Sequence, residues 1–437
     1  MSPGGANTND PSPRAMRSAA VHVVRALREK GHVAYLAGGC VRDELLGLEP
    51  KDYDVATSAH PEQVQELFRR TNAVGASFGV VLVRERRCTT EVATFRADGP
   101  YADARRPDHV EYADAERDAQ RRDFTINALF IDPMEDDPAQ RVIDYVNGRR
   151  DLDDRVLRAV GDAAARLRED HLRALRAVRF AARYGLSIER GTADAIRAHA
   201  SDLRGVSVER IGDEVRRMLG HASRAHAVKM LHELGLDRAI LGETDHAHAL
   251  GVLERLDPGA APMTALAAWA IDRSGRSKRG GAPGGVADVA GWRRALNLSN
   301  ADAQHLARVH EIATRFVGEG DGAFERAALS AQKRLLADPL AGDALLLARA
   351  IDSEAGRRVA RARDALAGDG VGIGPKPLLP GDALVRAGYV PGPGFGALLD
   401  AVYDAQLEGR VRDRVGAMRL AGDLAPGCGV ERAGDGA

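Results

Sequence analysis

Cysteine is scarce in this 437-residue chain, which contains only Cys40, Cys88 and Cys428. None of them stands in a C-x-x-C pair or beside a histidine cluster, so the sequence predicts neither a disulfide framework nor a zinc site. Long apolar runs are also missing, and the first residues include no apolar segment of signal-peptide length. We therefore expect a cytoplasmic protein that has no membrane partner.

An excess of positive charge is absent too. The formal net charge is −1, whereas proteins that coat nucleic acid through bulk charge carry a strong positive excess. This balance excludes that class of protein but leaves room for a local basic surface. The chain also lacks a repeat of fixed period, which excludes a solenoid.

The order of β-rich and helical patterns predicts an α+β fold. Within residues 18–150, short β-rich runs such as 89–95 alternate with helical segments such as 61–70, which predicts a head with a small mixed sheet flanked by helices. Beyond Asp151, apolar residues recur three and four positions apart, so we expect the remainder to be almost entirely helical. No feature of the sequence indicates an oligomeric state.

Composition divides the chain further. Segments rich in Pro, Gly, Asn and Ser predict disorder at both ends, and Gly-rich stretches at 275–288 and 366–384 predict breaks between helical parts. The predicted parts are a disordered arm, a head, a helical neck, a helical body, a helical tail and a disordered end, at residues 1–17, 18–150, 151–220, 221–375, 376–425 and 426–437.

One segment of the head combines features that suit a nucleoside triphosphate. A predicted strand ends at Gly38 and Gly39, whose missing Cβ atoms let backbone N–H groups approach a phosphate, and a predicted helix follows with Arg42 in its first turn. Asp52 and Asp54 are two apart on a second predicted strand, so both carboxylates share one face and could hold a hard cation such as magnesium. Taken alone, each feature is more typical of a turn or a solvated edge.

The combination is more specific than its parts. Gly-Gly-x-Val-Arg-Asp, nine residues before Asp-x-Asp, resembles the polymerase-β-like nucleotidyltransferases and, in this form, the family of bacterial CCA-adding enzymes and poly(A) polymerases. The resemblance covers at least residues 33–217. It implies that Asp52 and Asp54 are catalytic metal ligands for magnesium, with two ions expected. The nucleotide-binding residues that it implies here are Gly38, Gly39, Arg42 and Asp43.

A second head motif begins at Arg121, where Arg-Arg-Asp-Phe-Thr-Ile-Asn resembles a segment of the same family. The resemblance implies that Arg122 contacts the bound nucleotide and that Asp123 and Asn127 support the site. A helix start capped by Asp or Thr would account for the same residues, and the two interpretations are compatible. Glu91 is placed like a third active-site carboxylate that binds metal or activates the primer hydroxyl, but an ordinary exposed strand residue remains the alternative.

A third motif, Glu-Asp-His-Leu-Arg from residue 169, resembles the family's nucleotide-selecting helix. Asp170, Arg173, Arg176 and Arg179 are three apart, which places them on neighbouring sectors of one helix side. The resemblance implies that Asp170 and Arg173 bond the base edge of CTP or ATP, with Arg176 and Arg179 nearer the phosphates. A carboxylate accepts from the exocyclic amine that C and A share, and a guanidinium donates to ring acceptors, whereas G and U present the opposite pattern. A salt-bridged surface helix is the alternative.

Two segments bear on the choice of substrate. The polar stretch 98–111 predicts a loop, in a place where a flexible loop of the family assists the change from C to A addition. Residues 75–80 lack the basic side chains that bacterial poly(A) polymerases typically carry there, which favours tRNA.

Two weaker patterns lie in the helical part. Asp245-His-Ala-His with the segment 266–272 faintly resembles a metal-dependent phosphohydrolase, but Ile271 stands where a histidine ligand is expected, so we expect no hydrolase activity. Residues 384–409 suit either a tail piece whose Gly/Pro turn meets RNA phosphates or a plain helix-turn-helix.

Together these motifs predict an enzyme that adds C, C and A from CTP and ATP to the 3′ end of tRNA and releases pyrophosphate. A poly(A) polymerase or an enzyme that adds only A is the nearest alternative. An RNA-binding protein that has lost catalysis is a more distant one, and the presence of Asp52, Asp54, Arg122, Asp170 and Arg173 argues against it.

Overall fold

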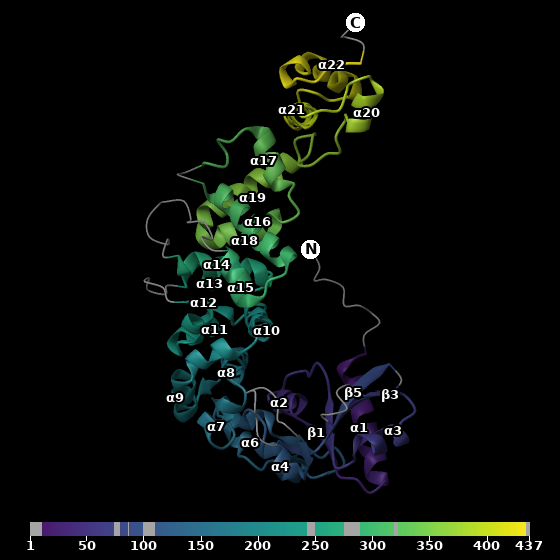
Figure 1. Ribbon diagram of the computed structural model, residues 1–437, viewed down its shortest axis with the longest axis vertical. Coiled ribbons are helices and arrows are strands. Elements are labelled where there is room, and N and C mark those ends of the chain that lie inside the picture. The colour runs from purple at the N-terminus through teal and green to yellow at the C-terminus, as the bar shows by residue number, and fades with distance from the viewer. Residues whose placement is uncertain are drawn as a thin grey trace. The chain divides into compact units, whose positions relative to one another are not determined.

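The computed structural model describes residues 11–73, 79–85, 87–98, 110–242, 250–274, 289–318 and 322–433. The chain divides into two compact units (Figure 1). The first unit is Met1–Met218 with His226–Glu243, and the second unit is Leu219–Ala225 with Thr244–Ala437. Strands are concentrated in the first unit and helices dominate the rest, so the predicted α+β fold is confirmed.

A seven-stranded mixed sheet with the order β3-β4-β5-β2-β1-β8-β9 forms the head. Its strands are β1 Ala34–Ala37, β2 Asp54–Thr57, β3 Thr71–Ala73, β4 Val80–Glu85, β5 Cys88–Thr94, β8 Phe130–Ile131 and β9 Val142–Ile143. β2 pairs antiparallel with β1 and parallel with β5, in a register that sets Asp54 opposite Glu91. The sheet therefore brings two of the predicted carboxylates side by side.

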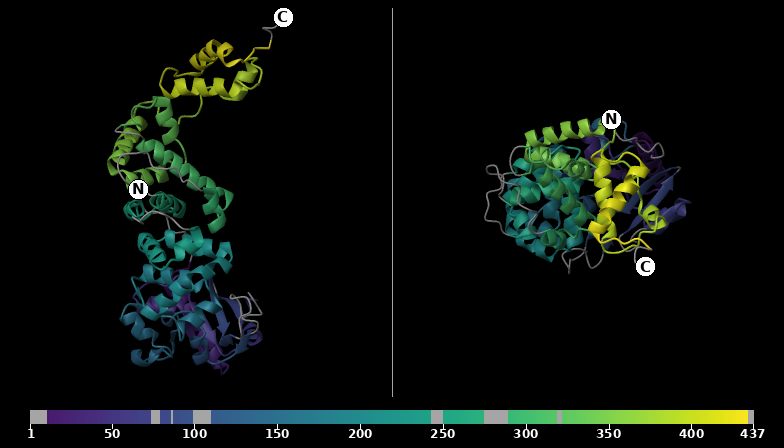
Figure 2. Two further views of the ribbon diagram at one scale, coloured as in Figure 1. Left: turned by 60° about the vertical axis from the view of Figure 1, so that its left-hand side comes forward. Right: turned by 90° about the horizontal axis from the view of Figure 1, so that it is seen from above.

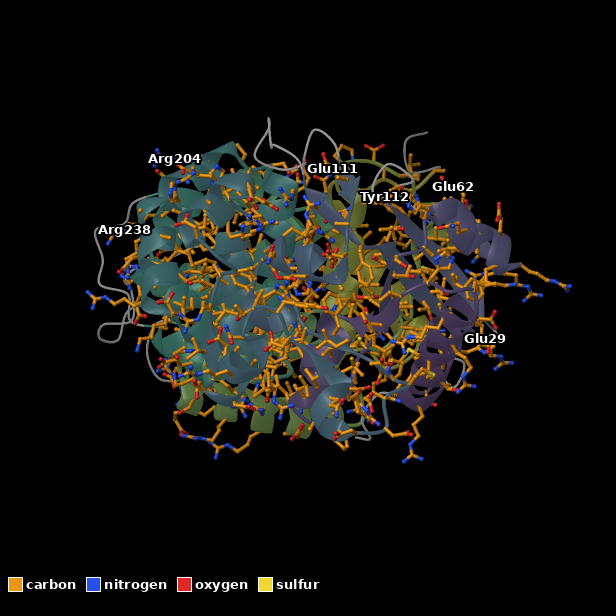
Figure 3. All side chains as sticks on the ribbon, turned by 90° about the horizontal axis from the view of Figure 1, so that it is seen from below. Glu29, Glu62, Glu111, Tyr112, Arg204 and Arg238 are labelled. Carbon is orange, nitrogen blue, oxygen red and sulfur yellow. The ribbon has the colours of Figure 1, made fainter. Side chains whose placement is uncertain are left out.

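Short helices and one small ribbon surround this sheet. They are α1 Pro13–Glu29, α2 Gly39–Leu45, α3 Pro61–Leu67, α4 Ala115–Gln120, the 3-10 turn η2 Thr125–Asn127, α5 Pro138–Arg141 and α6 Gly148–Asp153, with β6 Arg96–Asp98 paired to β7 Val110–Tyr112. α1 packs against β1, β2 and β5, and α1 and α3 lie beside the strands in Figure 1. The exposed side chains of Glu29 and Glu62, from these two helices, lie at the periphery in Figure 3.

α1 begins earlier than the sequence suggested. The predicted disordered arm, 1–17, is wrong for its last residues because the helix begins at Pro13. The Ser12 side chain accepts a hydrogen bond from the Ala15 N–H, and Pro13 takes the first helical position, where its missing N–H costs nothing. Pro and Ser are common in loops, but both are also favoured where a helix starts.

The helices that follow the head are α7 Ala163–Glu169, α8 Arg173–Tyr184, α9 Arg190–Ala198, the 3-10 segment η3 Ala200–Gly205, α10 Val208–Leu219, α11 Arg224–Glu233 and α12 Leu236–Leu241. Two short strands, β10 Val156–Leu157 and β11 Ser187–Ile188, also pair in parallel here. The expectation of an almost entirely helical remainder missed this pair, because two-residue strands carry no periodic pattern.

The second unit is helical in its described parts. Its helices are α13 Gly251–Arg255, α14 Pro262–Arg273, α15 Val289–Leu296, α16 Asn300–Val317, α17 Leu329–Leu336, α18 Ala341–Ile351, α19 Ser353–Ala367, α20 Gly381–Arg386, α21 Phe395–Leu407 and α22 Arg414–Leu424, followed by the 3-10 turn η4 Pro426–Cys428. No helix within the described ranges has the length and apolarity that crossing a membrane requires.

The last three helices, yellow in Figure 2, share an apolar core that extends to Val430. Arg432 then donates a hydrogen bond to the Ala387 carbonyl. The predicted disordered end, 426–437, therefore begins too early, since its first residues pack against the tail.

Candidate active site

A cavity of about 550 Å³ in the first unit gathers most of the predicted site residues. Those that line it are Gly38, Gly39, Arg42, Asp54, Glu91, Arg122, Asp123, Asn127, Asp170, Arg173 and Arg176. The lining does not include Asp43, Asp52 or Arg179. Three motifs that are far apart in the sequence thus meet in one hollow.

The two strand carboxylates Asp54 and Glu91 line the cavity, and the charge of Asp52 acts on both of them. Asp54 is the first residue of β2, whereas Asp52 precedes the strand, so the prediction that both lie on a strand is wrong for Asp52. Burial, followed by the charges of Glu91 and Asp52, raises the pKa of Asp54 to about 7, although Arg122 opposes the shift. Burial and the Asp52 charge likewise raise the pKa of Glu91. These carboxylates are therefore close enough to repel one another, and a divalent cation would relieve that repulsion.

The donor set fits an ion that is shared with a substrate. Within the described ranges, no group of three or more His, Cys, Asp or Glu side chains could hold a metal ion together. Magnesium usually binds one or two carboxylates and completes its shell with water and substrate phosphates. Asp52 and Asp54 suit that kind of site rather than a cage made only of protein.

Arg122 is held in place by a buried carboxylate that the sequence reading missed. Its Nε and Nη2 donate to Asp118 Oδ2 at 3.1 and 2.9 Å, and its Nη1 donates to the Asn127 carbonyl at 3.0 Å. Asp118 is 2% exposed and also binds Arg121. Burial would raise the pKa of Asp118, but the two arginines lower it. Asp118 lies three and four positions before two arginines that directly follow α4, and this spacing is a signal that could have identified it.

Gly38 leaves the space that Arg122 occupies. Its φ is +71°, and an added Cβ would lie 3.0 Å from Arg122 Nη1. A side chain here would be strained and would also crowd the guanidinium. Glycine is thus required for the approach of an arginine to the end of β1.

Arg42 is 5% exposed and makes its hydrogen bonds to protein groups. Its Nη1 donates to Asn127 Oδ1 at 2.5 Å, and its Nη2 donates to Tyr184 Oη at 2.6 Å and to Asp43 Oδ1 at 2.7 Å. Arg42 therefore joins α2 to η2 and α8, and its predicted contact with phosphate stays a prediction.

Asp123 and Asn127 continue this network. Asn127 Nδ2 donates to Asp123 Oδ1 at 3.1 Å, and Arg176 of α8 donates twice to Asp123 Oδ2. Burial alone would raise the pKa of Asp123, but Arg176 and these hydrogen bonds hold it at about 2. The Phe124 N–H also donates to Asp123 Oδ1, but Phe124 itself is the N-cap residue of η2 and its side chain makes no capping hydrogen bond, so the interpretation of a start capped by Asp or Thr is wrong.

The predicted base-selecting pair lies at a break between helices. Asp170 lies between the end of α7 and the start of α8, so it is not on one continuous helix with Arg173 as predicted. Arg210 of α10 donates to Asp170 Oδ2 at 2.6 Å, and Arg173 Nη1 donates to Glu169 Oε2 at 2.5 Å. Arg210 was missed because it lies forty residues further along the chain with no local pattern to mark it.

Arg179 does not line the cavity and pairs with a residue of α10. Its Nε donates to Glu214 Oε2 at 2.5 Å, and its guanidinium lies 4.2 Å from the centre of the Phe180 ring. It stabilises the packing of α8 on α10, and its proposed proximity to phosphate stays a prediction.

Comparison with known proteins bears on this site. A family model described as the poly A polymerase head domain matches residues 34–158, and one described as a probable RNA and SrmB-binding site of polymerase A matches residues 185–247. A CCA-adding enzyme of Limosilactobacillus fermentum is 32% identical over 409 residues, which cover 92% of this chain and 96% of the relative. The chain belongs to the CCA-adding enzyme family. The resemblance in the motifs is thereby confirmed.

Two further family members match this chain, one in sequence over about half of its length and one in structure over nearly all of it. A CCA-adding enzyme of Geobacillus thermodenitrificans is 42% identical over 224 residues, 51% of this chain and 54% of the relative. The chain thus spans about half the length of the curated relatives that it matches with higher identity. The crystal structure of the Bacillus stearothermophilus CCA-adding enzyme in complex with CTP superimposes with a TM-score of 0.74 at 27% identity, covering 96% of this chain and 100% of that chain.

The phosphohydrolase-like pattern has a structural explanation in this family member. Asp272 accepts hydrogen bonds from the Val252 and Leu253 N–H groups at 3.0 and 2.9 Å, so its carboxylate caps α13. The absence of hydrolase activity stays a prediction. The histidines at 246 and 248, residues 75–78, most of the loop at 98–111 and the Gly-rich stretch at 275–288 lie outside the described residues.

Proposed function

We propose that this chain adds C, C and A from CTP and ATP to the 3′ end of tRNA, without a nucleic-acid template. One observation carries the proposal: the carboxylates Asp54 and Glu91 line the same cavity as the pair Asp170 and Arg173. The first set suits triphosphate chemistry and the second suits recognition of a base. Membership of the CCA-adding enzyme family supports the same assignment.

The base would be selected by side chains that are already held in place. Asp170 is fixed by Arg210 and by the Leu172 N–H, and a carboxylate has about four lone-pair sites, so it retains capacity to accept from an exocyclic amine. Arg173 is fixed by Glu169 and would donate to ring acceptors. Rigid partners of this kind favour one hydrogen-bonding pattern over another because a mismatched base would leave them unpaired.

The reaction would use Asp52 and Asp54 to hold magnesium, with two ions expected. Bound magnesium would neutralise the triphosphate and lower the pKa of the attacking RNA hydroxyl. That hydroxyl would attack the α-phosphate in line, and pyrophosphate would leave. Glu91 lies opposite Asp54, and its raised pKa suits either metal binding or acceptance of the hydroxyl proton. Arg122 would hold the nucleotide from the end of β1.

A poly(A) polymerase or an enzyme that adds only A would use the same cavity. The poly A polymerase head model that matches residues 34–158 supports keeping this alternative. The two candidate functions differ in product length rather than in chemistry, so product length is the property to measure.

The deciding experiment supplies the purified chain with tRNAs that end before CCA, after C and after CC, together with CTP, ATP or both. Addition that stops at CCA supports the proposal. A long A tract supports the poly(A) polymerase, and A added only to the CC-ending tRNA supports the A-adding form. Asp52→Ala is expected to abolish addition and Glu62→Gln, at an exposed site in α3, to leave it unchanged. An Asp52→Ala variant with full activity would refute the metal assignment.

A further inference from the structure

The residue between the two proposed metal ligands faces the interior. Tyr53 is 5% exposed, whereas Asp52 is exposed and Asp54 is half-buried. Tyr53 directly joins these two aspartates in the chain, and its side chain is packed in the interior of the head. The position of this ring is therefore linked to the position of both carboxylates.

The Tyr53 hydroxyl is held by a small polar network. It donates to Glu44 Oε1 at 2.9 Å, and the same oxygen accepts from Arg17 Nε at 2.7 Å. Glu44 belongs to α2 and Arg17 to α1. One carboxylate oxygen thus joins the start of β2 to two helices of the head.

Strand pairing does not extend to Asp52. β2 begins at Asp54, which pairs with Ala37 on one side and Glu91 on the other. Asp52 lies two residues before this first pair, beyond Tyr53. The hydroxyl of Tyr53 therefore restrains the backbone that carries Asp52 where the sheet does not. Such restraint matters because metal ligands need to lie within about 0.5 Å of their working positions.

We propose that Tyr53, held by Glu44, is a positioning residue for Asp52 and Asp54. The inference rests on the proposed function, because it takes these two aspartates as the metal ligands. Tyr53 acts through the backbone and contacts no substrate. If the ring merely filled the interior, phenylalanine would serve equally well, so the hydroxyl oxygen is the feature to test.

The test measures binding of Mn²⁺ to the full-length chain in the presence of a non-hydrolysable ATP analogue and without tRNA, by electron paramagnetic resonance of the free ion. We expect Tyr53→Phe to weaken Mn²⁺ binding by about tenfold, the lower range for loss of an outer-shell partner. The matched control is Tyr145→Phe, which removes the same atom from an exposed tyrosine of the head. It is expected to bind Mn²⁺ as the wild type does.

A second pair of variants tests the role of Glu44. Glu44→Gln keeps a side-chain oxygen that can accept from Tyr53, so its Mn²⁺ affinity is expected to stay near that of the wild type. Glu44→Ala removes the acceptor and is expected to match Tyr53→Phe. Combining Tyr53→Phe with Glu44→Ala is expected to add little to either change, because both remove the same hydrogen bond.

The outcomes separate this inference from the proposed function. Equal Mn²⁺ affinity in Tyr53→Phe and the wild type overturns the positioning role. If Tyr53→Phe unfolds at a lower temperature than the wild type, the two Glu44 variants provide the test instead. Equal Mn²⁺ affinity in Glu44→Gln and Glu44→Ala then overturns the positioning role. A wild-type chain that binds Mn²⁺ but extends no tRNA overturns the proposed function alone. A wild-type chain that binds no Mn²⁺ overturns the metal assignment and this inference together.

Discussion

Asp123 and Arg176 form the ion pair that ties the head to α8. Arg176 Nε and Nη2 both donate to Asp123 Oδ2, at 2.9 and 2.6 Å. Asn127 bonds the other oxygen of Asp123, and Arg42 bonds Asn127. A continuous chain of hydrogen bonds thus runs from α2, which begins at Gly39, to α8, which begins at Arg173.

Arg176→Ala tests how much this pair stabilises the first unit. The Asp123 side chain is 10% exposed, and removing its partner leaves a buried carboxylate without its ion pair, which we expect to cost about 2–3 kcal/mol. Trp269 and Trp292 both belong to the second unit, so tryptophan fluorescence would miss the change. Hydrogen exchange of peptides from α8 would detect it. Arg190→Ala, at a side chain that is 95% exposed, is the control and should leave this exchange unchanged.

Acid should weaken the same contact. The pKa of Asp123 is about 2 in the folded chain, below its ordinary value of about 3.9, so its contribution to the free energy of unfolding is complete above about pH 5 and is lost as the pH falls through 2. A shift of this size corresponds to about 2–3 kcal/mol. The stability difference between wild type and Asp123→Asn should be constant from about pH 6 to 8 and shrink below about pH 4.

Urea unfolding followed by circular dichroism at each pH measures that difference. Asp153→Asn, at a side chain that is 63% exposed, provides the control and should not change the pH profile. A difference between wild type and Asp123→Asn that persists unchanged to about pH 2 would contradict the assignment of the low pKa to Asp123.

Asp118→Asn should weaken nucleotide binding more than it slows turnover. Asparagine keeps one acceptor but loses the charge that fixes Arg122 and Arg121, so the two guanidinium groups become less well placed. We expect the KM for ATP and CTP to rise by about tenfold, the effect of about 1.4 kcal/mol, with a smaller change in kcat. Steady-state kinetics measure KM and kcat for ATP on a CC-ending tRNA and for CTP on a tRNA that ends before CCA. Glu116→Gln, at an exposed position on the same helix, should change neither, and a loss confined to kcat would contradict the positioning of Arg122.

Local sequence patterns identified some strands of the head sheet, and the motifs identified most of the residues that line the cavity. The predicted strand that ends at Gly38, the one that carries Asp54 and the run 89–95 became β1, β2 and β5, and eleven predicted residues line one cavity. Such patterns succeed because strand alternation and the order of short motifs are properties of neighbouring residues. The family resemblance added the expectation that the three motifs would meet.

The remaining features depended on contacts between distant residues. Arg210 of α10 binds Asp170, and Glu214 of the same helix binds Arg179. No sequence pattern near Arg210 or Glu214 indicates these partners. The motif predicts that Arg42 binds phosphate, and it gives no sign of the hydrogen bonds that Arg42 donates to Tyr184 and Asn127. Packing decides which charged side chains pair with other protein groups and which face a ligand. A single sequence does not show this packing.

Gly148→Ala tests the close contact of α6 with η2. A Cβ at Gly148 would lie 2.1 Å from the Thr125 carbonyl oxygen, far inside van der Waals contact. Because Thr125 begins the turn that ends at Asn127, relief of this clash should displace the Asp123 and Asn127 network. We expect a loss of about 1–3 kcal/mol in stability and weaker binding of ATP.

Thermal unfolding with and without ATP measures both effects, since a ligand that binds only the folded chain raises its Tm. The control is Gly205→Ala, where an added Cβ meets no atom within 4 Å, and its stability should stay within about 0.5 kcal/mol of the wild type. If Gly148→Ala lost stability but kept the full ATP-induced rise in Tm, η2 could shift without moving the nucleotide site. That result would contradict the coupling of Asn127 to the cavity, because the same turn carries both the clash and the hydrogen bonds.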